Sequence, residues 1–101
     1  MENITAEKLQ QLISNNETIL VDYWAKWCGP CKTLIPRLEA FEAQYPKVKF
    51  VKIDVDENQD HAIEAGIRSV PTIMIMKGGE LLDRSSGVNT EAYYKNILNN
   101  L

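Results

Sequence analysis

The chain has 101 residues, of which 45% are hydrophobic and 25% are charged, and these proportions predict one ordinary globular domain over residues 1–101. Its net charge of −3 provides no basic surface for DNA or RNA, and no apolar run approaches the ~20 residues that a membrane span needs. We therefore expect neither a nucleic-acid partner nor a membrane partner.

The N-terminal segment, MENITAEKLQ, lacks the basic region and the apolar region of a secretory signal peptide. If Met1 is the natural start, we expect the protein in the cytoplasm. A cysteine pair in that reducing compartment is more often catalytic, redox-sensing or metal-binding than a permanent crosslink.

The first half of the chain alternates helical and strand patterns. Thr5 has the residue type of an N-cap, for a helix that extends to about Asn15. Residues 18–25, TILVDYWA, are β-branched, aromatic and almost wholly apolar, which is typical of a central parallel strand covered on both faces. A long helix is predicted from about residue 30 to residue 45, and Pro36 inside it is expected to kink it.

The second half adds a strand, a short helix, a hairpin and a last helix. Residues 48–55, VKFVKIDV, predict a strand, and residues 59–65 predict a short helix that ends at a glycine. Residues 72–76 and 80–85 predict a β-hairpin around the Gly78-Gly79 turn. Thr90 is predicted to cap the last helix, whose apolar face would consist of Tyr94, Ile97, Leu98 and Leu101.

This order of elements predicts an α/β fold. Strands that alternate with helices imply right-handed parallel crossovers, whereas the hairpin adds antiparallel strands. We expect a three-layer α/β/α sandwich with a central mixed sheet of four to five strands and four flanking helices.

Both cysteines of the chain, Cys28 and Cys31, lie at the predicted turn from strand to helix, with Pro30 suited to the first helical turn. Residues three apart on a helix bring their Cβ atoms to roughly 5 to 6 Å, from which a small adjustment allows a disulfide. The helix N-terminus favours the thiolate of Cys28, the form that attacks a disulfide. Cys31, one turn deeper, is placed to resolve the resulting mixed disulfide.

A zinc or iron–sulfur site is the alternative interpretation of this cysteine spacing. Such sites generally use four ligands, and the chain offers no second cysteine pair and only one histidine, His61. A CxxC motif beside a βαβ pattern favours redox chemistry, so we expect no bound metal.

The segment VDYWAKWCGPCK at residues 21–32, followed by SVPT at 69–72 and by GG at 78–79, resembles the thioredoxin family across residues 4–101. The resemblance implies the thioredoxin fold, no cofactor and a monomer that reduces protein disulfides by dithiol–disulfide exchange. Cys28 would attack the substrate, Cys31 would displace the reduced product, and thioredoxin reductase would restore the dithiol. Because the segment before the first helix is short, the family's first strand is expected to be shortened to residues 2–4 or missing.

The dipeptide between the cysteines, Gly29 and Pro30, matches the reducing members of that family, whereas related isomerases and oxidases carry a histidine in this loop. The same resemblance implies an apolar docking surface beside Cys28, made of Trp27, Pro30, Val70, Gly87 and Val88. A half-buried packing role is the alternative for Trp27.

Asp22 is the one charged residue of the first long strand. Burial there would raise its pKa toward neutrality and allow it to exchange a proton, and the resemblance implies that it deprotonates Cys31. The alternatives are a solvent-facing aspartate and a structural hydrogen-bond acceptor. Lys52 matches a lysine that lies near this carboxylate in the family, although a solvated strand lysine is also consistent with the sequence.

Pro71 stands before the first hairpin strand, where a missing amide donor is tolerated. General frequencies favour a trans bond to Val70, but the family resemblance implies a cis bond that lies against the dithiol. Met74 and Met76 are interpreted as core residues. We expect His61, the acidic run at residues 54–58 and Lys77 to be solvated or to lie at a helix start.

Two other functions remain open from the sequence. One is a disulfide isomerase or oxidase with the same fold, and the other is a thioredoxin-fold subunit that binds a partner regardless of its redox state.

Overall fold

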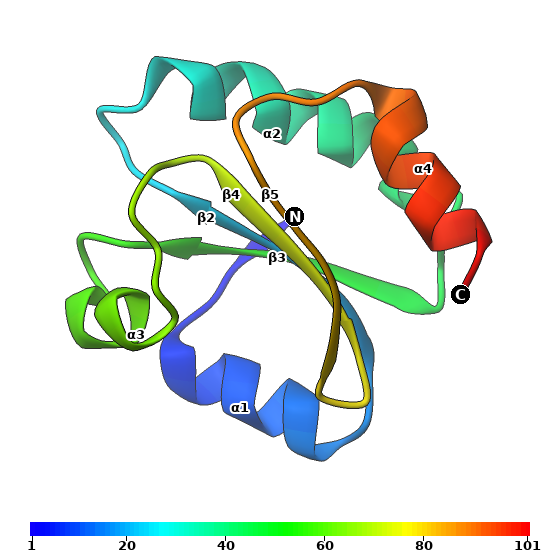
Figure 1. Ribbon diagram of the computed structural model, residues 1–101, viewed down its shortest axis with the longest axis horizontal. Helices are drawn as coiled ribbons and strands as arrows, with labels where there is room; N and C mark the ends of the chain where they lie inside the picture. The colour runs from blue at the N-terminus through cyan, green and yellow to red at the C-terminus, as the bar shows by residue number, and fades with distance from the viewer.

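The computed structural model describes residues 1–101 and has the element order β1-α1-β2-α2-β3-α3-β4-β5-α4 (Figure 1). The strands are β1 (Glu2–Asn3), β2 (Thr18–Trp24), β3 (Val48–Asp54), β4 (Thr72–Lys77) and β5 (Glu80–Ser86). The helices are α1 (Ala6–Ser14), α2 (Gly29–Glu42), α3 (Gln59–Glu64) and α4 (Glu91–Asn99). The predicted α/β/α sandwich is confirmed.

The strands form one sheet in the order β1-β3-β2-β4-β5. Strands β1 and β2 run parallel to β3, whereas β4 is antiparallel to β2 and β5 is antiparallel to β4. The sheet is therefore mixed, as predicted, and β2 occupies its centre. In this register Asp22 lies between Lys52 of β3 and Ile73 of β4.

Helices α1 and α3 cover one face of the sheet, and α2 and α4 cover the other (Figure 1). Successive side chains of a strand point to opposite faces, so Val21 and Tyr23 join the core under α1 and α3 while Leu20 joins the core under α2 and α4. Asp22 has the same parity as Leu20. Its side chain therefore faces the layer of α2 and α4.

Side-chain caps and glycines begin and end these elements as the sequence predicts. Thr5 Oγ1 accepts from the backbone N–H of Lys8 at 3.2 Å, and Thr90 Oγ1 accepts from that of Tyr93 at 3.2 Å. Gly78 and Gly79 have φ angles of 57° and 84°, the left-handed values that a tight hairpin turn requires. Local residue chemistry therefore accounts for both helix starts and for the hairpin.

Several predicted boundaries differ from the structure. Strand β1 is present but has only two residues, and β2 ends at Trp24, one residue earlier than expected. Leu101 was predicted on the face of the last helix, but α4 ends at Asn99 and Leu101 is 41% exposed. That prediction was wrong because the last carbonyls of a helix have no partner in it, so its end frays. Helix α2 continues through Pro36.

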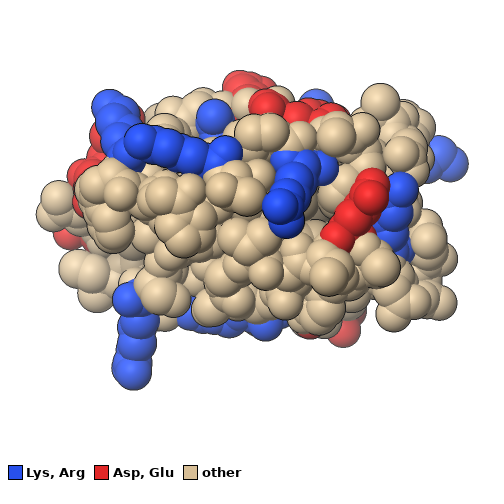
Figure 2. Space-filling view, turned by 90° about the horizontal axis from the view of Figure 1, so that it is seen from above, with Lys and Arg blue, Asp and Glu red and all other residues tan.

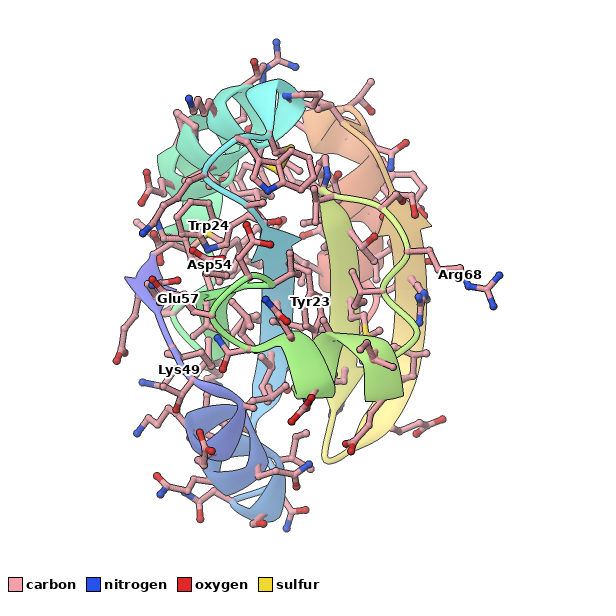
Figure 3. All side chains as sticks on the ribbon, turned by 90° about the vertical axis from the view of Figure 1, so that its left-hand side faces the viewer. Tyr23, Trp24, Lys49, Asp54, Glu57 and Arg68 are labelled. Atoms are coloured by element: carbon pink, nitrogen blue, oxygen red, sulfur yellow. A yellow bond between two sulfur atoms is a disulfide. The ribbon has the colours of Figure 1, made fainter.

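Two residues that were expected to be solvated or to lie at a helix start are covered more than expected: Asp54 is buried and His61 is half-buried. Asp54 is 1% exposed, and its Oδ1 accepts from the backbone N–H of Asp56 at 2.9 Å. It is covered because the parallel register places it beside Trp24 at the carboxyl ends of β3 and β2 (Figure 3). The His61 ring stacks on the Tyr23 ring, and the distance from His61 Nε2 to the Tyr23 hydroxyl oxygen is 2.9 Å. The two residues meet because α3 packs against that face of β2.

No helix of the structure has both the length and the apolar character that crossing a membrane would require. On the face that carries α2 and α4, lysine and arginine side chains are scattered among uncharged surface, and some lie next to acidic side chains (Figure 2).

Candidate active site

Cys28 is the N-cap of α2 and forms a disulfide with Cys31 in the first turn of that helix. The two Cα atoms lie 5.3 Å apart, and the Sγ atom of Cys28 accepts from the backbone N–H of Cys31 at 3.2 Å. Strand β2 ends at Trp24, and the chain turns there through the bond from the Cys28 N–H to the Ala25 carbonyl. The predicted pairing at a strand-to-helix turn is confirmed.

The two sulfur-bearing residues differ in their access to solvent. Cys28 is 4% exposed, and Cys31 is fully buried. Cys28 is thus less open than its place at the turn suggested, because Ala25 and Val70 pack around the pair. Only Cys28 presents any surface to a disulfide on another molecule.

The start of α2 is electrostatically suited to an anionic sulfur. A helix N-terminus carries unpaired N–H groups and the positive end of the helix dipole. The first turn of α2 contains no acidic residue that would oppose this field. When the disulfide is reduced, the site therefore favours the thiolate of Cys28.

Asp22 is fully buried, which confirms its predicted burial. Burial raises the pKa of its carboxyl to about 7, and the charge of Lys52 partly opposes this rise. Neither carboxylate oxygen has a hydrogen-bond partner within the protein. The site therefore contains an acid that changes its protonation state near neutral pH.

Lys52 does not behave as an independent solvated lysine. Its Nζ lies 5.0 Å from the centre of the Trp24 ring, a cation–π arrangement. From the strand next to Asp22 it also stabilises the carboxylate. The sequence interpretation that placed Lys52 near this carboxylate agrees with the structure.

An apolar surface lies beside the disulfide. Trp27 is 70% exposed, so it is not the half-buried packing residue of the alternative interpretation. With Val55, Ile67 and Val70 it lines a shallow pocket of about 120 Å³.

The loop that contains Pro71 completes this surface. The Val70–Pro71 peptide bond is cis, as the family resemblance implied. The Pro71 carbonyl accepts from the Gly87 N–H at 2.9 Å, and next to Gly87, Val88 is 38% exposed. This bond extends the β4–β5 hairpin by one pair beyond Thr72 and Ser86, and so it holds the two segments side by side.

Some residues of this site could not be found from the sequence. Asp56 Oδ2 accepts from the indole N–H of Trp27 at 2.9 Å, although Asp56 belongs to the run that was expected to be solvated. Ile67 and Arg68 also line the pocket next to Trp27. A contact between residues so distant in the chain leaves no periodic pattern that could predict it.

The structure contains no group of three or more His, Cys, Asp or Glu side chains that could hold a metal ion. The two sulfurs that a metal site would use are bonded to each other.

Comparison with known proteins gives a consistent result over the whole chain. The family model described as thioredoxin matches residues 1–100. A thioredoxin of Porphyra purpurea is 43% identical over 91 residues, which are 89% of this chain and 85% of that protein.

Solved structures agree with the sequence relatives. Fasciola hepatica thioredoxin superposes with a TM-score of 0.87 at 37% identity and covers 98% of each chain. The oxidized form of mitochondrial thioredoxin 3 from Saccharomyces cerevisiae also gives a TM-score of 0.87 at 37% identity, over 100% of this chain and 95% of that one.

Proposed function

The chain belongs to the thioredoxin family, and we propose that it acts in the reducing direction, with thioredoxin reductase as its electron donor. Cys28 and Cys31 are the redox-active motif of a thiol–disulfide oxidoreductase. The observation that carries the proposal is the asymmetry of this pair: one sulfur at the helix cap has some surface, and the other is enclosed one turn deeper.

In the proposed reaction, the Cys28 thiolate attacks one sulfur of a substrate disulfide and releases the other sulfur as a thiolate. Cys31 then loses its proton and attacks the Cys28 sulfur. This second attack forms the Cys28–Cys31 disulfide and releases the second substrate thiolate. Two electrons pass to the substrate, and the reductase returns two electrons to the pair.

We assign Asp22 to the proton of Cys31. A carboxyl with a pKa of about 7 is half ionised near neutral pH, which is the property that a general base needs. Lys52 tunes this carboxyl through its charge. Gly29 and Pro30 tune the cysteine pair, because Pro30 supports the first helical turn and neither residue adds a charge.

Substrate proteins would dock on the apolar surface around the disulfide. The proposed contacts come from three connecting segments: Trp27 before α2, Val70 and Pro71 before β4, and Gly87 and Val88 after β5. Of these residues, Trp27 and Val88 expose apolar side chains, and exposed apolar side chains grouped at one place typically mark a protein interaction site.

The wider role that we propose is electron transport to disulfide-containing proteins for redox homeostasis, by a monomer consisting of a single domain over residues 1–101. A reducing compartment such as the cytoplasm suits this role, since disulfides there are mostly transient. Sedimentation analysis tests whether the chain is a monomer. Imaging of the tagged chain at its native level tests whether it lies in the cytoplasm.

Trapping of substrates tests the mechanism directly. The Cys31→Ser variant, mixed with cell extract, is expected to retain partners as mixed disulfides through Cys28, because the second attack cannot occur. The Cys28→Ser/Cys31→Ser variant is the matched control and should trap none. Full reductase activity of Cys31→Ser without trapped partners contradicts the mechanism, and full function of the double variant indicates a redox-independent binding subunit.

The reduction potential of the pair tests the direction of transfer. We expect a value close to the roughly −270 mV that serves as the reference for thioredoxin itself. A value near the roughly −180 to −120 mV of disulfide isomerases and oxidases would assign the chain to those functions instead.

A further inference from the structure

Tyr94 places a phenol inside the core under α2 and α4. The residue is 1% exposed and packs with Ile73 and Leu34. Its hydroxyl oxygen accepts from the backbone N–H of Asn89 at 3.2 Å. Burial raises the pKa of this phenol, and the charge of Asp22 adds to the rise. The phenol therefore keeps its proton, and its O–H is free to donate to a further group.

Two groups in the same layer can accept that proton. Ser85 Oγ and both oxygens of Asp22 are buried without a hydrogen-bond partner in the protein. Buried polar atoms are nearly always hydrogen-bonded in folded proteins. Three unpartnered oxygens close to one phenol therefore require an explanation.

The sheet register brings these groups to one face. Ile73 of β4 pairs with Asp22 on one side and with Ser85 of β5 on the other. Directly paired residues point to the same face, and two strand spacings put the Asp22 and Ser85 Cα atoms roughly 10 Å apart. Tyr94 belongs to the same buried cluster as Ile73. The charge of Asp22 raises the pKa of the Tyr94 phenol and the Ser85 hydroxyl lowers it, so both groups lie close enough to the phenol to act on it.

We infer that Tyr94 and Ser85 are positioning residues for Asp22. They form a chain of hydrogen bonds that begins at the Asn89 amide and passes through the Tyr94 phenol and the Ser85 hydroxyl. The chain ends at the Asp22 carboxylate, through one buried water where the gap requires it. The inference rests on the proposed role of Asp22 as the proton acceptor for Cys31.

Such a chain has a defined electrostatic effect. Hydrogen bonds donated to a carboxylate favour its ionised form and oppose the effect of burial. Tyr94 and Ser85 thus keep Asp22 available as a base at neutral pH.

The ionisable groups around Asp22 are few. Lys52 faces it from β3, Cys31 lies in the covering helix α2, and Tyr94 faces it from α4. The Tyr93 hydroxyl donates to Asp83 at 2.9 Å, and Ser85 lies close enough to lower the pKa of that phenol as well. The neighbour on β4, Ile73, cannot ionise.

The titration of Asp22 in the oxidised protein tests the inference, because the disulfide removes the two thiols from the titration. We propose to follow the ¹³C resonance of the Asp22 carboxyl from pH 5 to pH 9. Tyr94→Phe and Ser85→Ala are each expected to raise the midpoint by about 0.5 to 1 pH unit, the value of roughly one net hydrogen bond. An unmoved midpoint in both variants overturns the inference.

Two control variants separate the hydrogen bonds from packing. Ser85→Thr keeps the hydroxyl and should retain the midpoint of the unmodified protein. Tyr45→Phe removes a phenol whose hydroxyl donates to Asn99 in an exposed bond, and it should also leave the midpoint unchanged. If Tyr94→Phe does not fold, the comparison of Ser85→Ala with Ser85→Thr decides the question, and equal midpoints for these two variants overturn the inference.

Kinetics distinguish this inference from the proposed function. If Asp22→Asn releases the Cys28 mixed disulfide as fast as the unmodified protein at every pH, Asp22 has no role in turnover, and the titration still decides the hydrogen-bond chain. If Asp22→Asn releases the mixed disulfide slowly, Tyr94→Phe should also slow this release, by about three- to tenfold at pH values below the Asp22 midpoint. That factor corresponds to the expected rise of the midpoint by about 0.5 to 1 pH unit. Tyr94→Phe should have no further effect in the Asp22→Asn background.

Discussion

Asp22 lowers the stability of the fold, although the proposed reaction uses it as a base. It is fully buried at the centre of the sheet, and its oxygens have no partner in the protein. Leaving a buried polar group without hydrogen bonds is unfavourable, and an ionised one is more so. The protein therefore carries a residue that weakens the fold most when it is in the form the reaction requires.

The pH dependence of stability tests this cost. The folded protein holds the pKa of Asp22 at about 7, above its ordinary value of 3.8. The protonated form is thus favoured in the folded state. Below pH 4 the carboxyl is protonated in both states, so the free energy of unfolding carries no penalty from its ionisation. The free energy of unfolding falls as the pH rises from about 4 toward 7, and above pH 7 this penalty stays constant.

We expect Asp22→Asn to abolish this loss. The variant should exceed the unmodified protein in free energy of unfolding above pH 7 by an amount on the order of 4 kcal/mol, and by little at pH 4. Urea denaturation of the oxidised proteins at both pH values measures the difference. Glu80→Gln, which changes an exposed acid on β5, is the control. Equal pH dependence of Asp22→Asn and the unmodified protein contradicts the assignment.

At the scale of elements, Arg84 links β5 to the end of α3. Its guanidinium donates to the carbonyl of Ala65 at 2.8 Å and to that of Gly66. The last carbonyls of a helix lack partners within it, and a cation there also complements the helix dipole. Helix α3 is short and has no side-chain bond at its N-cap, so this contact holds the segment that leads to Val70 and Pro71.

Replacing that arginine should loosen α3 selectively. Arg84→Ala is expected to lower the free energy of unfolding by about 1 to 2 kcal/mol, since it removes hydrogen bonds from a charged donor. Amide exchange should rise at residues 61–67 more than elsewhere. Arg37→Ala is the matched control, because Arg37 is exposed on α2 and has no ion pair or hydrogen bond there. Exchange that rises equally over the whole chain contradicts a local role.

Across the whole molecule, stability should decrease from the centre of the sheet to its edges. Strand β2 is bonded on both sides and contributes to both core layers. Strand β1 has two residues, and β5 is a largely exposed edge strand. Segments with few buried contacts and open edges unfold locally at low free energy.

Native-state hydrogen exchange checks this gradient. We expect the amides of residues 19–23 to exchange last, through global unfolding, and those of β1 and β5 to exchange first. Mass spectrometry after exchange at neutral pH, on peptides that each cover one strand or helix, measures the order of exchange. Protection of β5 equal to that of β2 would show that something in solution covers this edge.

The sequence by itself determined the elements and the dithiol. Helix caps, strand periodicity, hairpin glycines and the CxxC spacing are local properties, because their partners lie within a few residues of one another. The cysteine pair could therefore be placed at a helix start without coordinates. The burial of Asp22 could also be predicted, since its neighbours in the same strand are apolar.

Only the tertiary structure decided which distant groups meet. The burial of Asp54 beside Trp24 and the bond from Trp27 to Asp56 follow from strand order and loop packing. The layer that contains Asp22, Ser85 and Tyr94 arises in the same way. Register across three strands and the docking of one helix set these contacts, and no pattern along a single segment encodes either of them.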